Sequence, residues 1–231
     1  MRLRGWLLLM LVLIGASGLS VWRGWVSLPP PWNPWAPLDV NAEPNLLTRY
    51  KLIRLSDDPQ LCDQALSNSG LRVTRQADSP DATCPLINTL RVQGGEVALS
   101  SSFLASCRLA VSFALFDRHV LQPAAQAVYG LAVTRVEHLG SFACRNVYNR
   151  DKGRLSQHAS ANALDIAGFR LADGRTVSVL KDWPKDNQDA RFLRQVRDGA
   201  CDLFSVVLSP DYNAAHHNHF HVDAGPWWVC R

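Results

Sequence analysis

The chain has 231 residues, of which 47% are hydrophobic, and a formal net charge of +4. This composition provides enough apolar side chains for one ordinary domain with an N-terminal appendage. Three of the positive charges, Arg2, Arg4 and Arg23, lie in the N-terminal segment. The remainder is nearly neutral, so we expect no nucleic-acid-binding surface.

An uncharged apolar stretch, residues 5–22, follows the short basic start. It has the form of a secretory signal peptide or of an uncleaved signal anchor. Small residues at 16–18 favour cleavage, whereas the flanking tryptophans favour a single membrane span with interfacial aromatic rings. We expect residues 1–27 to direct export in either case.

Residues 28–44 are rich in proline and tryptophan. This composition is typical of a stiff spacer that holds a domain away from a membrane, and a polyproline ligand for a partner protein is the alternative. The folded domain is therefore predicted to span residues 45–231.

Six cysteines form an even set without a CxxC motif. Export places them in an oxidising compartment, which favours disulfides over a zinc cluster. Fifteen pairings are possible, and we expect the three that close local loops. These are Cys62–Cys84, Cys107–Cys144 and Cys201–Cys230.

Hydrophobic periodicity and turn residues predict the elements of the domain in chain order. They are a short helix or linker at 45–57, a helix at 58–68, strands at 72–74 and 95–99, a helix at 103–128 capped by Ser102 and kinked at Pro123, a strand at 131–139, a hairpin of 163–171 and 176–180, a helix at 187–203, a strand at 204–208, a turn at 209–215 and a last strand at 217–222. This order predicts an α+β fold, an antiparallel sheet with flanking helices held by disulfides.

Five of the seven histidines fall in two segments, 156–166 and 216–223. In an extended strand His219, His221 and Asp223 share one face, while Phe220 and Val222 share the other.

In the first segment, Asp165 lies between Leu164 and Ile166, seven residues after His158. A buried carboxylate requires a cation, because an unpaired one costs several kcal/mol. Two histidines and one carboxylate with an open fourth position are the ligand set of a catalytic zinc site.

Each of these residues has an ordinary interpretation when taken alone, such as a loop histidine or a salt-bridged aspartate. Their joint occurrence favours a metal site. Asp223 is interpreted as an acceptor that orients a ligand histidine, and His217 as solvent-facing. His119, on the predicted helix at 103–128, is interpreted as a surface or packing residue.

The motif Ser156-x-His158, Ala163-x-Asp165 and His219-x-His221 resembles the metallopeptidase group of lysostaphin-type peptidases, D-Ala-D-Ala peptidases and murein endopeptidases. Residues 60–231 resemble the bacterial extensin-like C-terminal domain, a branch of that group. The resemblance implies a fold like that of the hedgehog domain and the DD-peptidases.

The resemblance also implies the roles of the site residues. One Zn²⁺ would be held by His158, Asp165 and His221. His216 would be the general base, and His219 would polarise water or stabilise developing charge. Arg145 would neutralise the oxyanion and contact substrate, and Ser156 is a turn or substrate-contact residue.

The resemblance finally implies a zinc peptidase that acts on stem or cross-link peptides of peptidoglycan in the periplasm, with residues 5–22 as an inner-membrane anchor if they are not cleaved. The alternative is a zinc-containing peptidoglycan-binding module without turnover, because Asn218 stands where the dipeptidase branch has a catalytic glutamate. A third hypothesis is a disulfide-bonded structural domain without metal.

Overall fold

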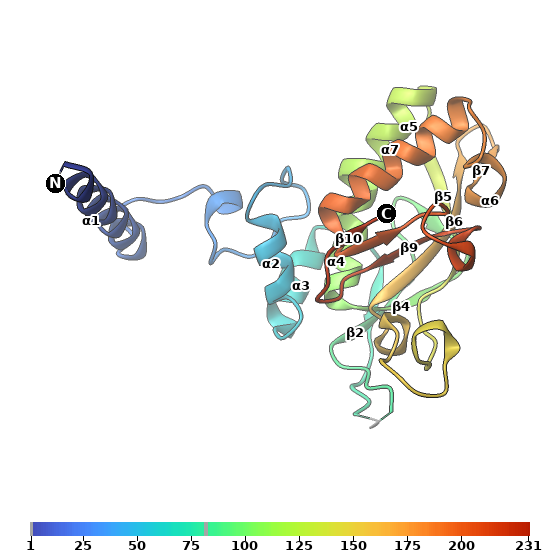
Figure 1. Ribbon diagram of the computed structural model, residues 1–231, viewed down its shortest axis with the longest axis horizontal. Coiled ribbons are helices and arrows are strands. Elements are labelled where there is room, and N and C mark those ends of the chain that lie inside the picture. Colours follow the sequence, from blue (N-terminus) through green and yellow to red (C-terminus); the bar gives the residue numbers. More distant parts are fainter. Residues whose placement is uncertain (1, 81–82) are drawn as a thin grey trace.

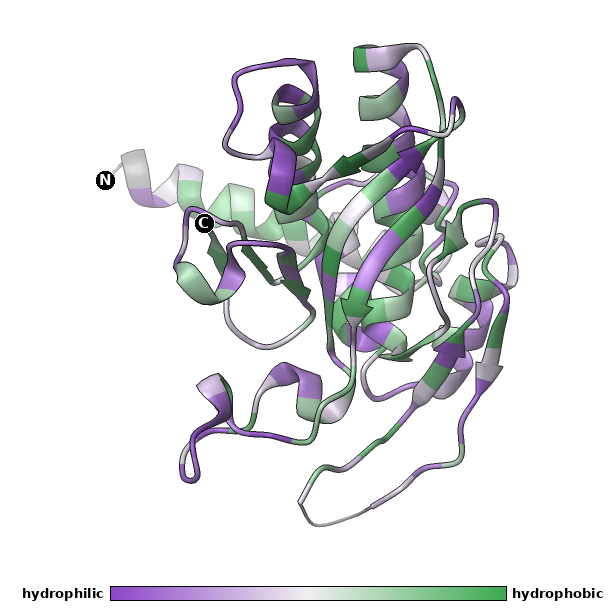
Figure 2. Cartoon of the chain, turned by 90° about the vertical axis from the view of Figure 1, so that its right-hand side faces the viewer, coloured by the Kyte–Doolittle hydropathy of each residue, from purple (hydrophilic) through white to green (hydrophobic). Residues whose placement is uncertain are grey.

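The computed structural model describes residues 2–80 and 83–231, and Figure 1 shows an N-terminal helix set apart from the rest of the chain. This helix, α1 (Arg2–Trp22), is mainly hydrophobic in Figure 2. Within it, Arg4–Trp22 is long and apolar enough to cross a membrane. The helix could therefore serve as a signal peptide or as a membrane anchor.

The other elements form the folded body. The helices are α2 (Thr48–Arg54), α3 (Pro59–Ser67), α4 (Cys107–Phe116), α5 (Gln122–Tyr129), α6 (Val179–Asp182) and α7 (Gln188–Leu203). The strands are β1 (Val73–Arg75), β2 (Thr89–Val92), β3 (Ala98–Leu99), β4 (Phe103–Ser106), β5 (Val133–Gly140), β6 (Ala163–Leu171), β7 (Thr176–Ser178), β8 (Val206–Leu208), β9 (Phe220–Asp223) and β10 (Val229–Cys230).

The larger sheet has the strand order β10-β8-β9-β6-β5-β3, and β7 pairs with β6. Its central pairs are antiparallel, whereas β10 pairs with β8 and β3 pairs with β5 in parallel. A smaller antiparallel sheet contains β1, β2 and β4. The predicted α+β fold with flanking helices and disulfides is confirmed.

Helices α4, α5 and α7 pack together beside the larger sheet (Figure 1). The space between these helices and the sheet contains aromatic rings that are almost fully buried: Phe113, Phe116, Phe169, Phe192 and Phe204. The edge of the Phe192 ring meets Phe169 of β6 at a centroid distance of 5.6 Å. This packing fixes β6, and with it the residues that β6 carries, against the helices.

The long helix predicted at 103–128 is wrong at its start, because residues Phe103–Ser106 form β4. The helix begins only after Ser106, whose hydroxyl caps it by accepting a hydrogen bond from the Leu109 amide at 3.2 Å. A π-helical turn over Asp117–Leu121 separates α4 from α5 and puts Pro123 in the first turn of α5, where proline is tolerated.

Two of the three predicted disulfides are wrong. The bonds are Cys62–Cys107 and Cys84–Cys144, whereas Cys201–Cys230 is confirmed. The expectation of local loops fails because α3 packs against α4 across the chain, which brings Cys62 to Cys107. Proximity in space and not in sequence decides the partner.

The proline-rich segment before α2 is attached to the domain. Leu38 and Val40 are buried in the core, and the Lys51 ammonium donates to the Pro30 carbonyl at 2.7 Å. His119 Nε2 lies 2.8 Å from the Val40 carbonyl, so its interpretation as a packing residue is confirmed. The domain boundary at residue 45 stays a prediction.

The predicted hairpin is confirmed, and one glycine makes it possible. A Cβ atom at Gly168 of β6 would lie 2.6 Å from the Val177 carbonyl oxygen of β7. We expect Gly168→Ala to lower the free energy of unfolding by about 1–3 kcal/mol, because the two strands must separate. Urea denaturation measures this. The control Ala167→Gly, one residue away on the same strand, should cost only about 0.5–1 kcal/mol, and equal losses would contradict the steric explanation.

Candidate metal centre

Asp165 and His221 meet because their strands are paired in register. In the antiparallel pair β6 and β9, Asp165 lies directly opposite His221, and Ile166 lies opposite Phe220. Directly opposed side chains project from the same face of a sheet. The apolar neighbours therefore enter the core, while the carboxylate and the imidazole face a cleft.

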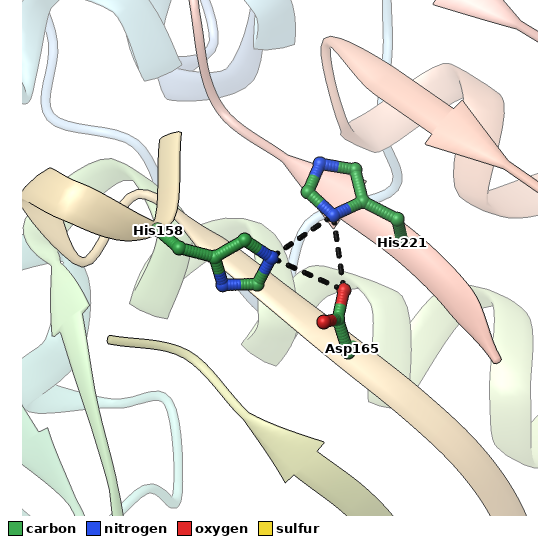
Figure 3. A group of neighbouring side chains, drawn as sticks. All are labelled: His158, Asp165 and His221. Atoms are coloured by element: carbon green, nitrogen blue, oxygen red, sulfur yellow. Dashed lines mark hydrogen bonds and ion pairs between the residues drawn. The ribbon is translucent and has the colours of Figure 1, made fainter. Parts of the chain in front are cut away.

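His158 reaches the same point from a short 3-10 turn, Gln157–Ser160, just before β6 (Figure 3). The Ser156 hydroxyl caps this turn by accepting a hydrogen bond from the His158 amide at 3.3 Å. Ala161 then turns the chain with a left-handed backbone, φ 52°. The turn is what places His158 beside a residue seven positions later.

The three side chains converge on one another (Figure 3). His158 Nε2 lies 3.3 Å from Asp165 Oδ1 and 3.2 Å from His221 Nδ1. His221 Nδ1 lies 3.0 Å from Asp165 Oδ1. These three residues could hold a metal ion together.

Hydrogen bonds on the far side of each ring decide which nitrogen faces the centre. His158 Nδ1 donates to the Ser141 carbonyl at 3.1 Å, so in a neutral ring Nε2 is the nitrogen without a proton. His221 Nε2 donates to the Asp223 carboxylate at 3.3 Å, so Nδ1 is the nitrogen that a neutral ring would offer to a metal. With both rings neutral, two nitrogen lone pairs and a carboxylate oxygen point at one another, an arrangement that is favourable only with a cation or protons between them.

The spacing of these atoms fits a tetrahedral ion. Zinc bonds to nitrogen and oxygen of ~2.0–2.1 Å separate neighbouring ligand atoms by about 3.3–3.4 Å. The observed separations of 3.0, 3.2 and 3.3 Å are close to this value. The donor set has two imidazoles and one carboxylate, so it also matches in chemistry.

Protons hold the cluster together when no cation is bound. Burial by itself would raise the pKa of Asp165, but hydrogen bonds from His158 and His221 hold it well below its usual value. Burial would lower the pKa of His221, but hydrogen bonds to Asp165 and Asp223 raise it to about 9. The surroundings therefore favour positive charge on the imidazole that a metal would contact.

Two further histidines lie beside the cluster. His219 Nε2 is 3.4 Å from Asp165 Oδ1, and burial lowers the pKa of His219. The predicted strand at 217–222 starts too early, because a 3-10 turn at Ala214–His216 precedes β9 and His219 lies just before the strand. His219 still comes close to Asp165, although not through strand alternation.

His216 completes the histidine group. Its ring centroid lies 5.3 Å from that of His219 and 5.8 Å from that of His221. Its Nδ1 donates to the Asn213 side chain at 2.8 Å, which leaves Nε2 as a proton acceptor. Burial, and then the neighbouring histidines, lower the pKa of His216 to about 4, so its ring is neutral at pH 7.

A cleft of about 530 Å³ opens over the cluster. Arg145 and Ser156 line it together with His158, Asp165, His216, His219 and His221, so all the predicted site residues are brought to one place. Asp223 also lines the cleft and its Oδ1 accepts from the Gly225 amide at 2.9 Å, so the interpretation of Asp223 as an orienting residue is supported. His217 is exposed, as predicted.

Sequence analysis missed two residues that orient the site. Asn213 fixes the tautomer of His216, and Ser141 fixes that of His158 through a backbone carbonyl. Asn213 lies three residues before His216 and also caps the short turn there by accepting from the Ala215 amide at 3.0 Å. An asparagine at the start of a turn is a sequence signal that could have identified Asn213. The backbone carbonyl of Ser141 has no corresponding signal in the sequence.

Comparison with known proteins gives one match. The family model described as Extensin-like protein C-terminus matches residues 60–231, which include every strand and most helices of the folded body. Searches of curated proteins and of solved structures gave no match. The match spans more than half of the chain and contains the whole candidate metal centre, and the chain therefore belongs to the Extensin-like protein C-terminus family.

Proposed function

We propose that this protein is an exported zinc-dependent peptidase that hydrolyses stem or cross-link peptides of peptidoglycan in the bacterial periplasm. The observation that carries the proposal is the convergence of one nitrogen from each of two imidazoles and one carboxylate oxygen in an open cleft. A structural zinc site would be closed by a fourth protein ligand, whereas a cleft leaves access for a substrate. The substrate class comes from the resemblance to peptidoglycan metallopeptidases.

The side chains around the centre suit peptide hydrolysis. Bound zinc supplies Lewis acidity, making water nucleophilic near neutral pH and polarising a carbonyl. Nε2 of neutral His216 takes the proton of the attacking water and returns it to the leaving amine. The guanidinium of Arg145 stabilises the negative charge of the tetrahedral intermediate, and the neutral ring of His219 helps to polarise the attacking water.

The N-terminal helix supports the location. An apolar helix that could be a signal peptide or a membrane anchor agrees with export, and the three disulfides agree with an oxidising compartment. If the helix is retained, the cleft works beside the inner membrane, where newly made wall polymer emerges.

One observation favours a second function, a zinc-containing peptidoglycan-binding module without turnover. The carboxylates that line the cleft, among the described residues, are Asp165 and Asp223, and both are already engaged with His221. Asn218 accepts a hydrogen bond from His219 at 2.8 Å and offers no acid or base. Catalysis then depends on His216 alone for proton transfer.

We expect His216→Ala to reduce the release of muropeptides by about 100-fold without changing zinc content, because the variant lacks the base but keeps the three ligands. The experiment incubates full-length, detergent-solubilised protein with purified sacculi and analyses the products by mass spectrometry. His217→Ala, an exposed neighbour, is the control and should match wild type. Wild-type protein that carries zinc and binds sacculi, but releases no muropeptides, would establish the binding module instead.

A further inference from the structure

The cleft has an aromatic rim that the hydrolytic residues do not use. It consists of Tyr148, Tyr212, Trp227 and Trp228, all of which line the cleft and are exposed to solvent. Trp227 is 59% exposed and Trp228 is 42% exposed. The two tryptophans follow β9, the strand that carries His221, after a turn at Gly225.

Exposed aromatic rings in this number need an explanation. Single exposed hydrophobic side chains are ordinary, but four exposed aromatic rings that line one cleft concentrate apolar surface in water. The buried phenylalanines between the helices and the larger sheet show that the fold has room to bury large rings elsewhere. A group of rings at the edge of a cleft therefore marks a surface that a ligand covers.

A guanidinium lies near the face of each tryptophan ring. The Arg154 guanidinium lies 5.7 Å from the centre of the Trp227 ring, and the guanidinium of Arg49, from α2, lies over Trp228. Rings that are ordered before binding lose little conformational entropy when a ligand covers them. The two arginine contacts thus favour ordered tryptophan rings before a ligand binds.

The charge of this part of the cleft is positive. Outside the histidine and aspartate cluster, the charged side chains lining the cleft are, among the described residues, Arg145 and Arg154. A guanidinium pairs well with a carboxylate. A fitting ligand therefore combines apolar faces with carboxylate groups.

We infer that the aromatic rim binds the saccharide chain of the wall polymer, with a sugar ring on Trp227 and a carboxylate of the attached peptide on Arg154. The C–H groups on one face of a sugar ring carry partial positive charge and pack on the negative face of an aromatic ring. The attached peptide then extends over the histidines in the same cleft. The identity of the polymer rests on the proposed function, whereas the binding requires no turnover.

A membrane surface is the other class of partner that exposed tryptophans suit. The position of the rim argues against it, because a bilayer covering the rim would also cover the cleft that contains the metal centre. The saccharide is therefore the occupant that leaves the site accessible to a substrate.

The test is calorimetric titration of full-length protein in lipid nanodiscs with peptide-free glycan strands and, separately, with free stem peptide. Trp227→Ala should weaken glycan binding about fivefold to tenfold and leave stem-peptide binding unchanged. Trp227→Phe should retain most of the glycan affinity, because it keeps an aromatic face. Trp35→Ala removes a tryptophan that is 58% exposed and does not line the cleft, so it should bind glycan like wild type.

Equal glycan affinities of wild type, Trp227→Ala and Trp35→Ala would overturn the inference. Quenching by brominated lipid that becomes weaker in Trp227→Phe would place this ring in the bilayer and also overturn it. Glycan binding that depends on Trp227, without muropeptide release, would support the saccharide site and reject the peptidase. Muropeptide release without Trp227-dependent glycan binding would support the peptidase and reject the saccharide site.

Discussion

Replacing His158 by alanine should remove the metal and abolish muropeptide release. The remaining pair, Asp165 and His221, offers two ligand atoms, which cannot hold an ion against water as three can. Zinc content should fall from about one ion per chain to near zero. Mass-spectrometric metal analysis of the purified full-length protein, run beside the sacculus digestion, measures both effects.

The melting temperature gives a second readout of the same change. A metal that binds only the folded state stabilises it, so EDTA should lower the melting temperature of wild type. It should have no effect on His158→Ala, which has no bound metal to lose. The EDTA comparison therefore separates loss of the ion from a simple defect in folding.

Two further variants test whether the loss of zinc is specific to the removal of a metal ligand. Asp223→Asn keeps all three ligands but weakens the hydrogen bond that orients His221, so zinc affinity should fall about 10- to 100-fold. His217→Ala should retain full zinc content because its exposed side chain lies outside the cluster. Stoichiometric zinc in His158→Ala would reject the metal centre described here.

Removing the disulfide Cys62–Cys107 by a double alanine substitution should cost about 4 kcal/mol of unfolding free energy. The bond closes a loop of 45 residues, and in the chain-entropy model a loop of this length restricts the unfolded chain by about that amount. Both cysteines are buried, and their bond joins α3 to the start of α4. Helix α4 carries the buried rings of Phe113 and Phe116. Urea denaturation under two-state conditions measures the loss.

The matched control is the double alanine variant of Cys201–Cys230, which closes 29 residues and should cost slightly less, about 3.6 kcal/mol. Peptide mapping of the oxidised protein should recover Cys62 linked to Cys107 and not to Cys84. Recovery of a Cys62–Cys84 peptide would contradict the connectivity, and an unchanged urea midpoint in the Cys62 and Cys107 variant would contradict its stabilising role.

The local sequence pattern predicted the structure correctly where residues close in sequence decide it. The Asp-Gly turn and its β-branched flanks predicted the hairpin of β6 and β7, and apolar periodicity predicted α7, because both depend on residues within one or two turns. The pattern failed at residues 103–106, where apolar side chains fit a helix and a strand equally well. Pairing with β2 resolves that ambiguity in favour of β4.

The sequence by itself determined which side chains are available: the histidines, the two aspartates, the six cysteines and the apolar N-terminal stretch. Only the tertiary structure decided how they meet. It set the register that opposes Asp165 to His221 across 56 residues, the partners of Cys62 and Cys84, and the Ser141 carbonyl that orients His158. The physical reason is that register and proximity are fixed by burial of the whole core, to which every element contributes, whereas periodicity records only the surroundings of each segment.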